Sequence, residues 1–115
     1  MECLRNYELS EEFGIVYIFK HRESGLTKIG ITNKNVHTRL NTLERQSGNT
    51  IEEYAISVPM RNGLEKIVEK ILHNKFSRKR KRGEYFDITF SDAVAELNRI
   101  TESNDFKKRN VEKSA

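Results

Sequence analysis

Two short apolar stretches joined by a polar segment constrain the fold of this chain more than any other feature. The first, residues 14–19, is rich in β-branched and aromatic side chains, and the second covers residues 28–32. The intervening residues 20–25 are polar and end in glycine, which is typical of a turn. The sequence therefore predicts a β-hairpin.

The register of this hairpin determines which side chains share a face. A pairing of Phe19 with Leu26 would place Tyr17 opposite Lys28 and bring Gly30 to the same face. The hairpin would then gather a phenol, an ammonium group and a bare glycine backbone, and we expect any chemistry to take place on this face.

The rest of the chain alternates helical and extended patterns. Apolar residues at spacings of three and four indicate helices, and runs of alternating apolar residues indicate strands. We predict a helix over about 36–46, a strand over 51–60, a helix over about 62–76, a short strand over 85–88 and a last helix that begins at a Ser91-Asp92 cap and reaches Ile100. The expected fold class is α/β (α+β by stricter naming), with a small, mainly antiparallel three-stranded sheet flanked by helices.

The helix predicted over 62–76 has the clearest pattern. Its apolar residues form one stripe that should face the core: Leu64, Ile67, Val68, Ile71, Leu72 and Phe76. Glu65, Glu69 and His73 follow at four-residue steps along one flank, at the margin between core and solvent. On spacing alone, Glu69 is a solvated carboxylate and Glu65 another.

Composition limits the class of protein. A chain of 115 residues can build one modest core, which we assign to residues 1–102, with 103–115 as a polar, mobile tail. The formal charge of +4 favours a polyanionic partner. A single cysteine needs no oxidising compartment, and neither a signal peptide nor an apolar run of about 20 residues is evident. We expect a cytoplasmic, intracellular protein with no membrane partner.

Four features in order resemble the GIY-YIG nuclease superfamily, over roughly residues 14 to 88. Val16-Tyr17 stands for the end of the first namesake motif and Lys28-Ile29-Gly30 for the second, followed by Arg39 and by a helix with Glu69. The segment 80–86 (RKRGEYF) resembles a phage-type branch in which lysine replaces the first tyrosine of the second motif.

The resemblance implies roles for four residues. Glu69 would be the sole protein ligand of a divalent metal, Mg²⁺ or Mn²⁺, and Tyr17 would orient or deprotonate the attacking water. Arg39 would bind a phosphate. Lys28 departs from the general family pattern, and either it or Tyr17 could be the base. Without the resemblance, Tyr17 is a packed strand tyrosine and Arg39 one more surface arginine.

Substrate contacts are expected from a second group of residues. Arg78, Arg80 and Arg82 belong to five consecutive cations, which suit a nucleic-acid backbone but equally a solvated loop. Gly30 would allow close approach of substrate to the backbone or mark a bulge. His73 would lie beside the metal ligand or at the helix border.

The leading hypothesis is a divalent-metal-dependent endonuclease that hydrolyses phosphodiester bonds, most simply in DNA. The sequence leaves DNA versus RNA open. One alternative is a nucleic-acid-binding module on the same scaffold without turnover, and another is a scaffold that binds an acidic protein.

Overall fold

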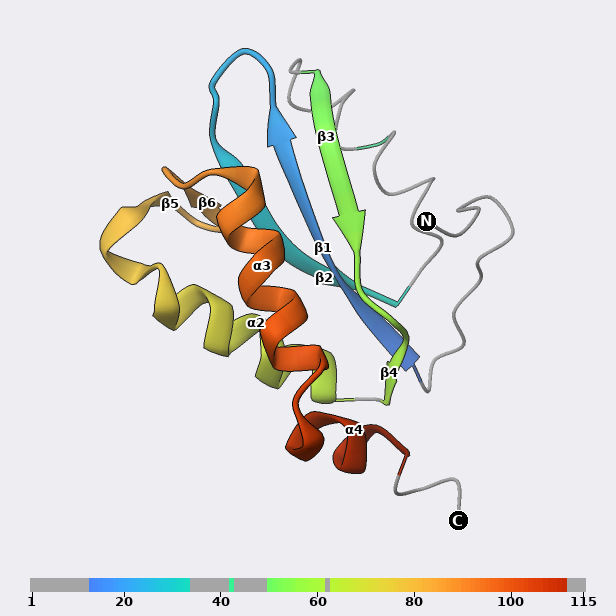
Figure 1. Cartoon of the computed structure of the whole chain (residues 1–115). Coiled ribbons are helices and arrows are strands. Elements are labelled where there is room, and N and C mark those ends of the chain that lie inside the picture. Colours follow the sequence, from blue (N-terminus) through green and yellow to red (C-terminus); the bar gives the residue numbers. More distant parts are fainter. Residues whose placement is uncertain (1–12, 34–41, 43–49, 62, 112–115) are drawn as a thin grey trace.

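A nine-residue strand, β1 (Phe13–His21), pairs with three other strands of the sheet (Figure 1). The computed structural model describes residues 13–33, 42, 50–61 and 63–111. The predicted helix over 36–46 falls almost entirely outside these residues. With the labels of Figure 1, the elements are β1 (Phe13–His21), β2 (Thr27–Thr32), β3 (Ile51–Ile56), β4 (Met60–Arg61), α2 (Leu64–Lys75), a 3₁₀ turn (Ser77–Lys79), β5 (Arg80–Arg82), β6 (Tyr85–Phe86), α3 (Phe90–Thr101) and α4 (Asn104–Val111).

The fold is α+β, as predicted: an antiparallel sheet flanked by helices. The sheet has the order β3-β1-β2-β6-β5, and β4 pairs with the start of β1. The three long strands are the ones predicted, and the short strands β4, β5 and β6 enlarge the sheet beyond three. In the described part of the chain, no helix has both the length and the apolar character that crossing a membrane requires.

The register of the β1–β2 hairpin differs from the predicted one by two residues. Tyr17 pairs with Gly30 and Phe19 with Lys28. The strands continue to His21, whose backbone nitrogen donates to the Leu26 carbonyl oxygen, so the turn is shorter than expected. Because side chains alternate with a period of two, this shift leaves the predicted residues on one face.

The two faces of the sheet carry separate apolar clusters. Val16 and Ile18 of β1 and Ile29 of β2 face α2 and α3, and form the main core with their buried residues. Ile15, Tyr17 and Phe19 form a smaller cluster on the opposite face. Tyr17 therefore lies on the face of the sheet that α2 does not cover.

The predicted strand over 51–60 is interrupted. β3 ends at Ile56, and Ser57 bonds to Val16 through its backbone nitrogen and its hydroxyl oxygen, both at 2.9 Å. Val58, within the predicted strand, is 53% exposed and lies outside β3. The chain then pairs with the other end of β1 through β4.

The predicted helix over 62–76 is confirmed as α2, but its stripe is only half buried. Leu64, Val68 and Leu72 lie in the core, whereas Ile67 and Ile71 are 47% and 41% exposed. Glu65, expected in solvent, is buried: its carboxylate accepts a hydrogen bond from the Gly63 backbone nitrogen at 3.0 Å and packs against Gly14, whose missing side chain leaves room for it.

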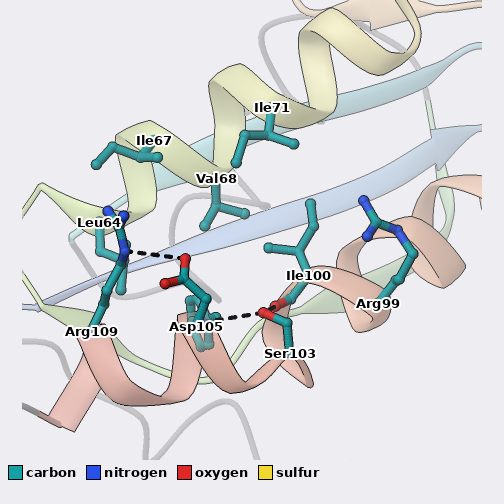
Figure 2. A pocket seen from close by; sticks show the side chains of 10 residues that line it. Leu64, Ile67, Val68, Ile71, Arg99, Ile100, Ser103, Asp105 and Arg109 are labelled. Carbon is teal, nitrogen blue, oxygen red and sulfur yellow. Dashed lines mark hydrogen bonds and ion pairs between the residues drawn. The ribbon is translucent and has the colours of Figure 1, made fainter.

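An apolar groove runs between α2, α3 and α4 (Figure 2). Ile67 and Ile71 line its α2 side, and the Asp105–Arg109 ion pair lies at its α4 side. These isoleucines are each two residues from Glu69, about 200° around the helix, so the groove and Glu69 occupy opposite sides of α2.

The C-terminal part of the described chain departs from two predictions. The cap of α3 is Thr89 rather than Ser91-Asp92, because the Thr89 hydroxyl accepts from the Asp92 backbone nitrogen at 3.0 Å. Residues 104–111, predicted as part of a polar tail, form α4, and Phe106 is buried in the main core. This single aromatic residue anchors a helix that is mostly polar.

Candidate functional site

The edge of β2 at Ile29 is where α2 and the β5–β6 hairpin meet. The Ile29 backbone nitrogen donates to the Glu84 carbonyl oxygen at 3.1 Å, and its carbonyl oxygen lies 2.9 Å from Nε2 of His73. The β2–β6 ladder pairs only Thr27 and Lys28 with residues of β6. The strand edge beyond Lys28 is therefore completed by one helix residue and one turn residue, which brings their neighbours together.

Lys28 occupies a cage of aromatic rings. Its Nζ lies 5.9 Å from the ring centre of Tyr17, 5.8 Å from that of Phe19 and 5.6 Å from that of Tyr85. The same nitrogen lies 3.7 Å from Oε1 of Glu84. Lys28 is only 8% exposed, so ring faces and a carboxylate replace much of the water around its charge.

Tyr17 lies over Gly30, its cross-strand partner. A Cβ atom on Gly30 would be 2.6 Å from the phenol oxygen of Tyr17 and 3.0 Å from Oε1 of Glu84, which is too close for any real side chain. The glycine thus makes room for the phenol; its predicted part in substrate binding stays a prediction. Tyr17 is buried, with 1% of its surface exposed.

Glu69 approaches this cluster from α2. Burial raises the pKa of its carboxyl group from the ordinary 4.5 to about 7, and the charge of Glu84 and a hydrogen bond between the two carboxyl groups act in the same direction. The Lys28 ammonium lowers the pKa. Oε2 of Glu69 is buried and accepts no hydrogen bond from the described residues. Glu69 is therefore a carboxyl group in an environment that disfavours its charge.

His73 lies next to Glu69, but both its ring nitrogens are engaged within the protein. Arg80 lies 3.1 Å from Nδ1, and an arginine can only donate, so Nε2 carries the proton and donates to the Ile29 carbonyl oxygen. The imidazole also packs on Phe86, with ring centres 5.0 Å apart. This arrangement holds His73 as a link between α2 and β2.

The three predicted arginine contacts fall into two groups. Arg78, Arg80 and Arg82 all have exposed surface. The Arg80 guanidinium, however, is held by His73 and lies 5.4 Å from the Phe86 ring centre. Arg78 is in the 3₁₀ turn and Arg82 at the end of β5. The basic segment thus has one arginine directed onto the protein.

Tyr85 completes the cage from β6, opposite Lys28 in the ladder. Its hydroxyl lies 3.1 Å from Nε2 of His21, and the two rings stack at 5.5 Å. Burial raises the pKa of Tyr85; Arg82 lowers it and Glu84 raises it. Tyr85 consequently remains a neutral phenol that packs against the ammonium.

The structure thus brings together Tyr17, Lys28 and Gly30 of the hairpin with Glu69 and His73 of α2. Arg39, predicted to bind phosphate, lies outside the described residues. Sequence reasoning missed the importance of Glu84 and Tyr85, although both stand in the quoted segment 80–86. Pairing β6 with β2 would have placed Tyr85 opposite Lys28 and revealed both residues.

The metal-binding capacity of the described residues is small. They contain no group of three or more histidine, cysteine, aspartate or glutamate side chains that could hold a metal ion. A zinc-type site needs three or four protein ligands. A hard cation that keeps most of its water takes only one or two carboxylates.

A comparison with models of known protein families gives a match over most of the chain. The family model T5orf172 domain matches residues 14–101, which include the whole sheet, α2 and α3. No curated protein and no solved structure matches the chain significantly.

Proposed function

The chain belongs to the T5orf172 domain family, and on that premise we propose that it is a divalent-metal-dependent endonuclease that hydrolyses phosphodiester bonds in DNA. One observation carries the proposal: the carboxyl group of Glu69, the ammonium group of Lys28 and the phenol of Tyr17 all adjoin the same residue, Glu84, at the edge of β2. Residues far apart in the sequence meet there.

The motif resemblance supports the same proposal. Tyr17, the Lys28-Ile29-Gly30 triplet and Glu69 are the described positions at which the chain resembles GIY-YIG nucleases. Strand pairing alone brings Tyr17 and Lys28 together, but Glu69 comes from α2, and the common location of all three at one strand edge is what a shared catalytic site requires.

Glu69 fits a divalent cation. Its buried Oε2 accepts no hydrogen bond from the described residues, and burial together with the charge of Glu84 raises its pKa although the Lys28 ammonium acts in the opposite direction. A bound Mg²⁺ or Mn²⁺ would stabilise the ionised carboxylate, acidify a coordinated water and neutralise charge on the phosphoryl oxygens.

Lys28 and Tyr17 have complementary parts in this reaction. Lys28 carries its charge at the margin of a low-polarity cage, where attraction to a phosphoryl oxygen is strong because little water screens it. The Tyr17 phenol can accept or donate one hydrogen bond and so orient an attacking water. Glu84 holds the ammonium and lies against the same glycine as the phenol.

Backbone phosphates are the expected contacts outside the reacting centre. Arg78 and Arg82 lie on the segment that leads into the Glu84 turn, so a strand bound at Glu69 would pass close to them. Such contacts neutralise phosphates without reading bases, and they predict binding that weakens as salt concentration rises.

A second candidate function is favoured by one specific observation. Tyr17 is 1% exposed, and a phenol without access to solvent cannot touch an attacking water unless its surroundings move. A nucleic-acid-binding module on the same scaffold, without turnover, would need no such access.

Nicking of supercoiled plasmid DNA tests the proposal. The unchanged chain should convert the plasmid to open circles with Mg²⁺ or Mn²⁺ and lose this activity in EDTA. Glu69→Gln should lower the rate by at least about 100-fold, since a metal ligand is lost. Glu102→Gln, an exposed site at the end of α3, is the matched control and should nick normally. Salt-sensitive binding of duplex DNA without nicking would support the second candidate, and nicking that ignores chelator and Glu69→Gln would refute the mechanism.

A further inference from the structure

Two carboxyl groups from different elements, those of Glu69 and Glu84, come to the β2 edge beside Ile29. The Glu84 carbonyl oxygen accepts from the Ile29 backbone nitrogen at 3.1 Å, and Nε2 of His73, which donates to the Ile29 carbonyl oxygen at 2.9 Å, lies 3.8 Å from Oε2 of Glu69. Glu69 projects from the middle of α2, and Glu84 from the turn between β5 and β6. Two carboxylates that lie close together repel each other. A divalent cation removes this repulsion, because it attracts both carboxylates.

Exposure distinguishes the two residues. The Glu69 side chain is 17% exposed, whereas that of Glu84 is 41% exposed. An incoming cation, which retains much of its hydration shell, therefore meets Glu84 first and reaches the buried Oε2 of Glu69 beyond it. Glu84 lies at the solvent entrance to the pair.

We propose that Glu84 is the second protein ligand of the divalent cation, so that the ion joins α2 to the β5–β6 turn through Glu69 and Glu84. This inference rests on the proposed function, because it concerns the same metal site. Two carboxylates, with water and substrate phosphate in the remaining positions, suit Mg²⁺ and Mn²⁺.

Glu84 also contacts Lys28, and the effect of this contact on metal affinity must be distinguished from direct ligation of the metal. Its Oε1 lies 3.7 Å from Nζ of Lys28. Removing the Glu84 charge would leave that ammonium less compensated and could weaken cation binding by repulsion alone. The test therefore has to be made with and without the Lys28 charge.

The direct measurement is the Kd of Mn²⁺ for the full chain without DNA. The electron paramagnetic resonance signal of free Mn²⁺ reports how much of the ion is bound. Glu69→Gln and Glu84→Gln should each raise the Kd for Mn²⁺ by about tenfold or more. Removing a residue that only hydrogen-bonds to a metal ligand already weakens metal binding by about this much, and removing a ligand should weaken it at least as much. Asp87→Asn, an exposed change three residues after Glu84, is the matched control and should bind Mn²⁺ as the unchanged chain does.

A double-mutant cycle with Lys28→Met separates direct ligation from repulsion. If Glu84 is a ligand, Glu84→Gln still raises the Kd by about tenfold in the Lys28→Met background, as a ligand's loss would. If Glu84 acts only through the ammonium, the Kd there is unchanged and the proposal is overturned. Glu84→Asp, which keeps a carboxylate, should bind more tightly than Glu84→Gln and provides a second comparison if the glutamine variant folds poorly.

The two-ligand metal site and the nuclease function can fail independently of each other. Mn²⁺ binding that depends on both glutamates, in a protein that nicks no DNA, would support the two-ligand site and refute the nuclease. Nicking that requires Glu69, with Mn²⁺ affinity indifferent to Glu84→Gln, would do the reverse. An unchanged chain that shows no saturable Mn²⁺ binding would overturn the second ligand as well.

Discussion

At the scale of single residues, Glu69 is the group whose chemistry depends most on its neighbours. Its pKa of about 7 in the metal-free fold compares with an ordinary value of 4.5. Between these two values the folded chain binds more protons than the unfolded chain. The free energy of unfolding must therefore fall as the pH rises from about 4.5 to about 7, and change little through this group at higher pH.

Glu69→Gln tests this sign because glutamine imitates the protonated acid. In EDTA, the variant should match the unchanged chain near pH 5 and exceed its stability near pH 8, by on the order of 2 kcal/mol after allowance for partial solvent exposure. Urea unfolding at both pH values gives the difference directly. Glu102→Gln should show no such pH-dependent gain, and a stability difference for Glu69→Gln that is equal at both pH values would contradict the buried charge.

The sequence predicted which residues lie together in the candidate site. It predicted less well which other groups those residues contact. Tyr17, Lys28 and Glu69 were found from motif spacing, and the structure brings them to one strand edge. The environment of Glu69 could not be predicted, because its pKa depends on Glu84, fifteen positions away and on another element. Helical periodicity places a side chain on a flank, but the flank's neighbours come from tertiary packing.

At the scale of elements, the sequence predicts the β1–β2 hairpin but not how the short strands pair with it. Local pattern gives β1 and β2, and a two-residue error in their register does not move a side chain to the other face. The pairing of β2 with β6 joins residues almost sixty positions apart, and two-residue strands carry no periodicity. The sequence therefore placed Tyr17 beside Lys28 but did not show that Tyr85 joins them, because nothing local to residues 85–88 indicates their partner strand.

The arginines of the segment that leads into the β5–β6 turn should make DNA binding depend on the salt concentration. If the chain binds duplex DNA through phosphates, Arg78→Gln and Arg82→Gln should each reduce the slope of log Kd against log salt by about 0.9. Arg80→Gln should change the slope less, since this guanidinium is held by His73 and Phe86. Fluorescence anisotropy with a labelled duplex at several salt concentrations measures the slopes.

The matched control for the salt series is Lys108→Gln, an exposed cation on α4 at the other end of the molecule (Figure 1). It carries the same charge change but lies away from the hairpin, so its slope should equal that of the unchanged chain. Equal slopes for all four variants would mean that the net charge of the protein, and not this hairpin, attracts the nucleic acid.

At the scale of the whole molecule, α4 lies beyond the family match, which ends at residue 101, yet it closes the main core. Phe106 is 5% exposed there, and Asn110 bonds to the Arg61 backbone nitrogen and the Pro59 carbonyl oxygen, each at 3.0 Å. Phe106→Ala should lower the free energy of unfolding by on the order of 3 kcal/mol, because a buried aromatic ring is lost and a cavity remains. Lys107→Ala, an exposed neighbour, should change it by less than about 0.5 kcal/mol. Urea unfolding of both variants measures the two losses of stability. A large loss for Phe106→Ala alone would make residues 104–111 part of the folding unit that supports Glu69 on α2. Equal, small losses for the two variants would mean that residues 14–101 fold without α4.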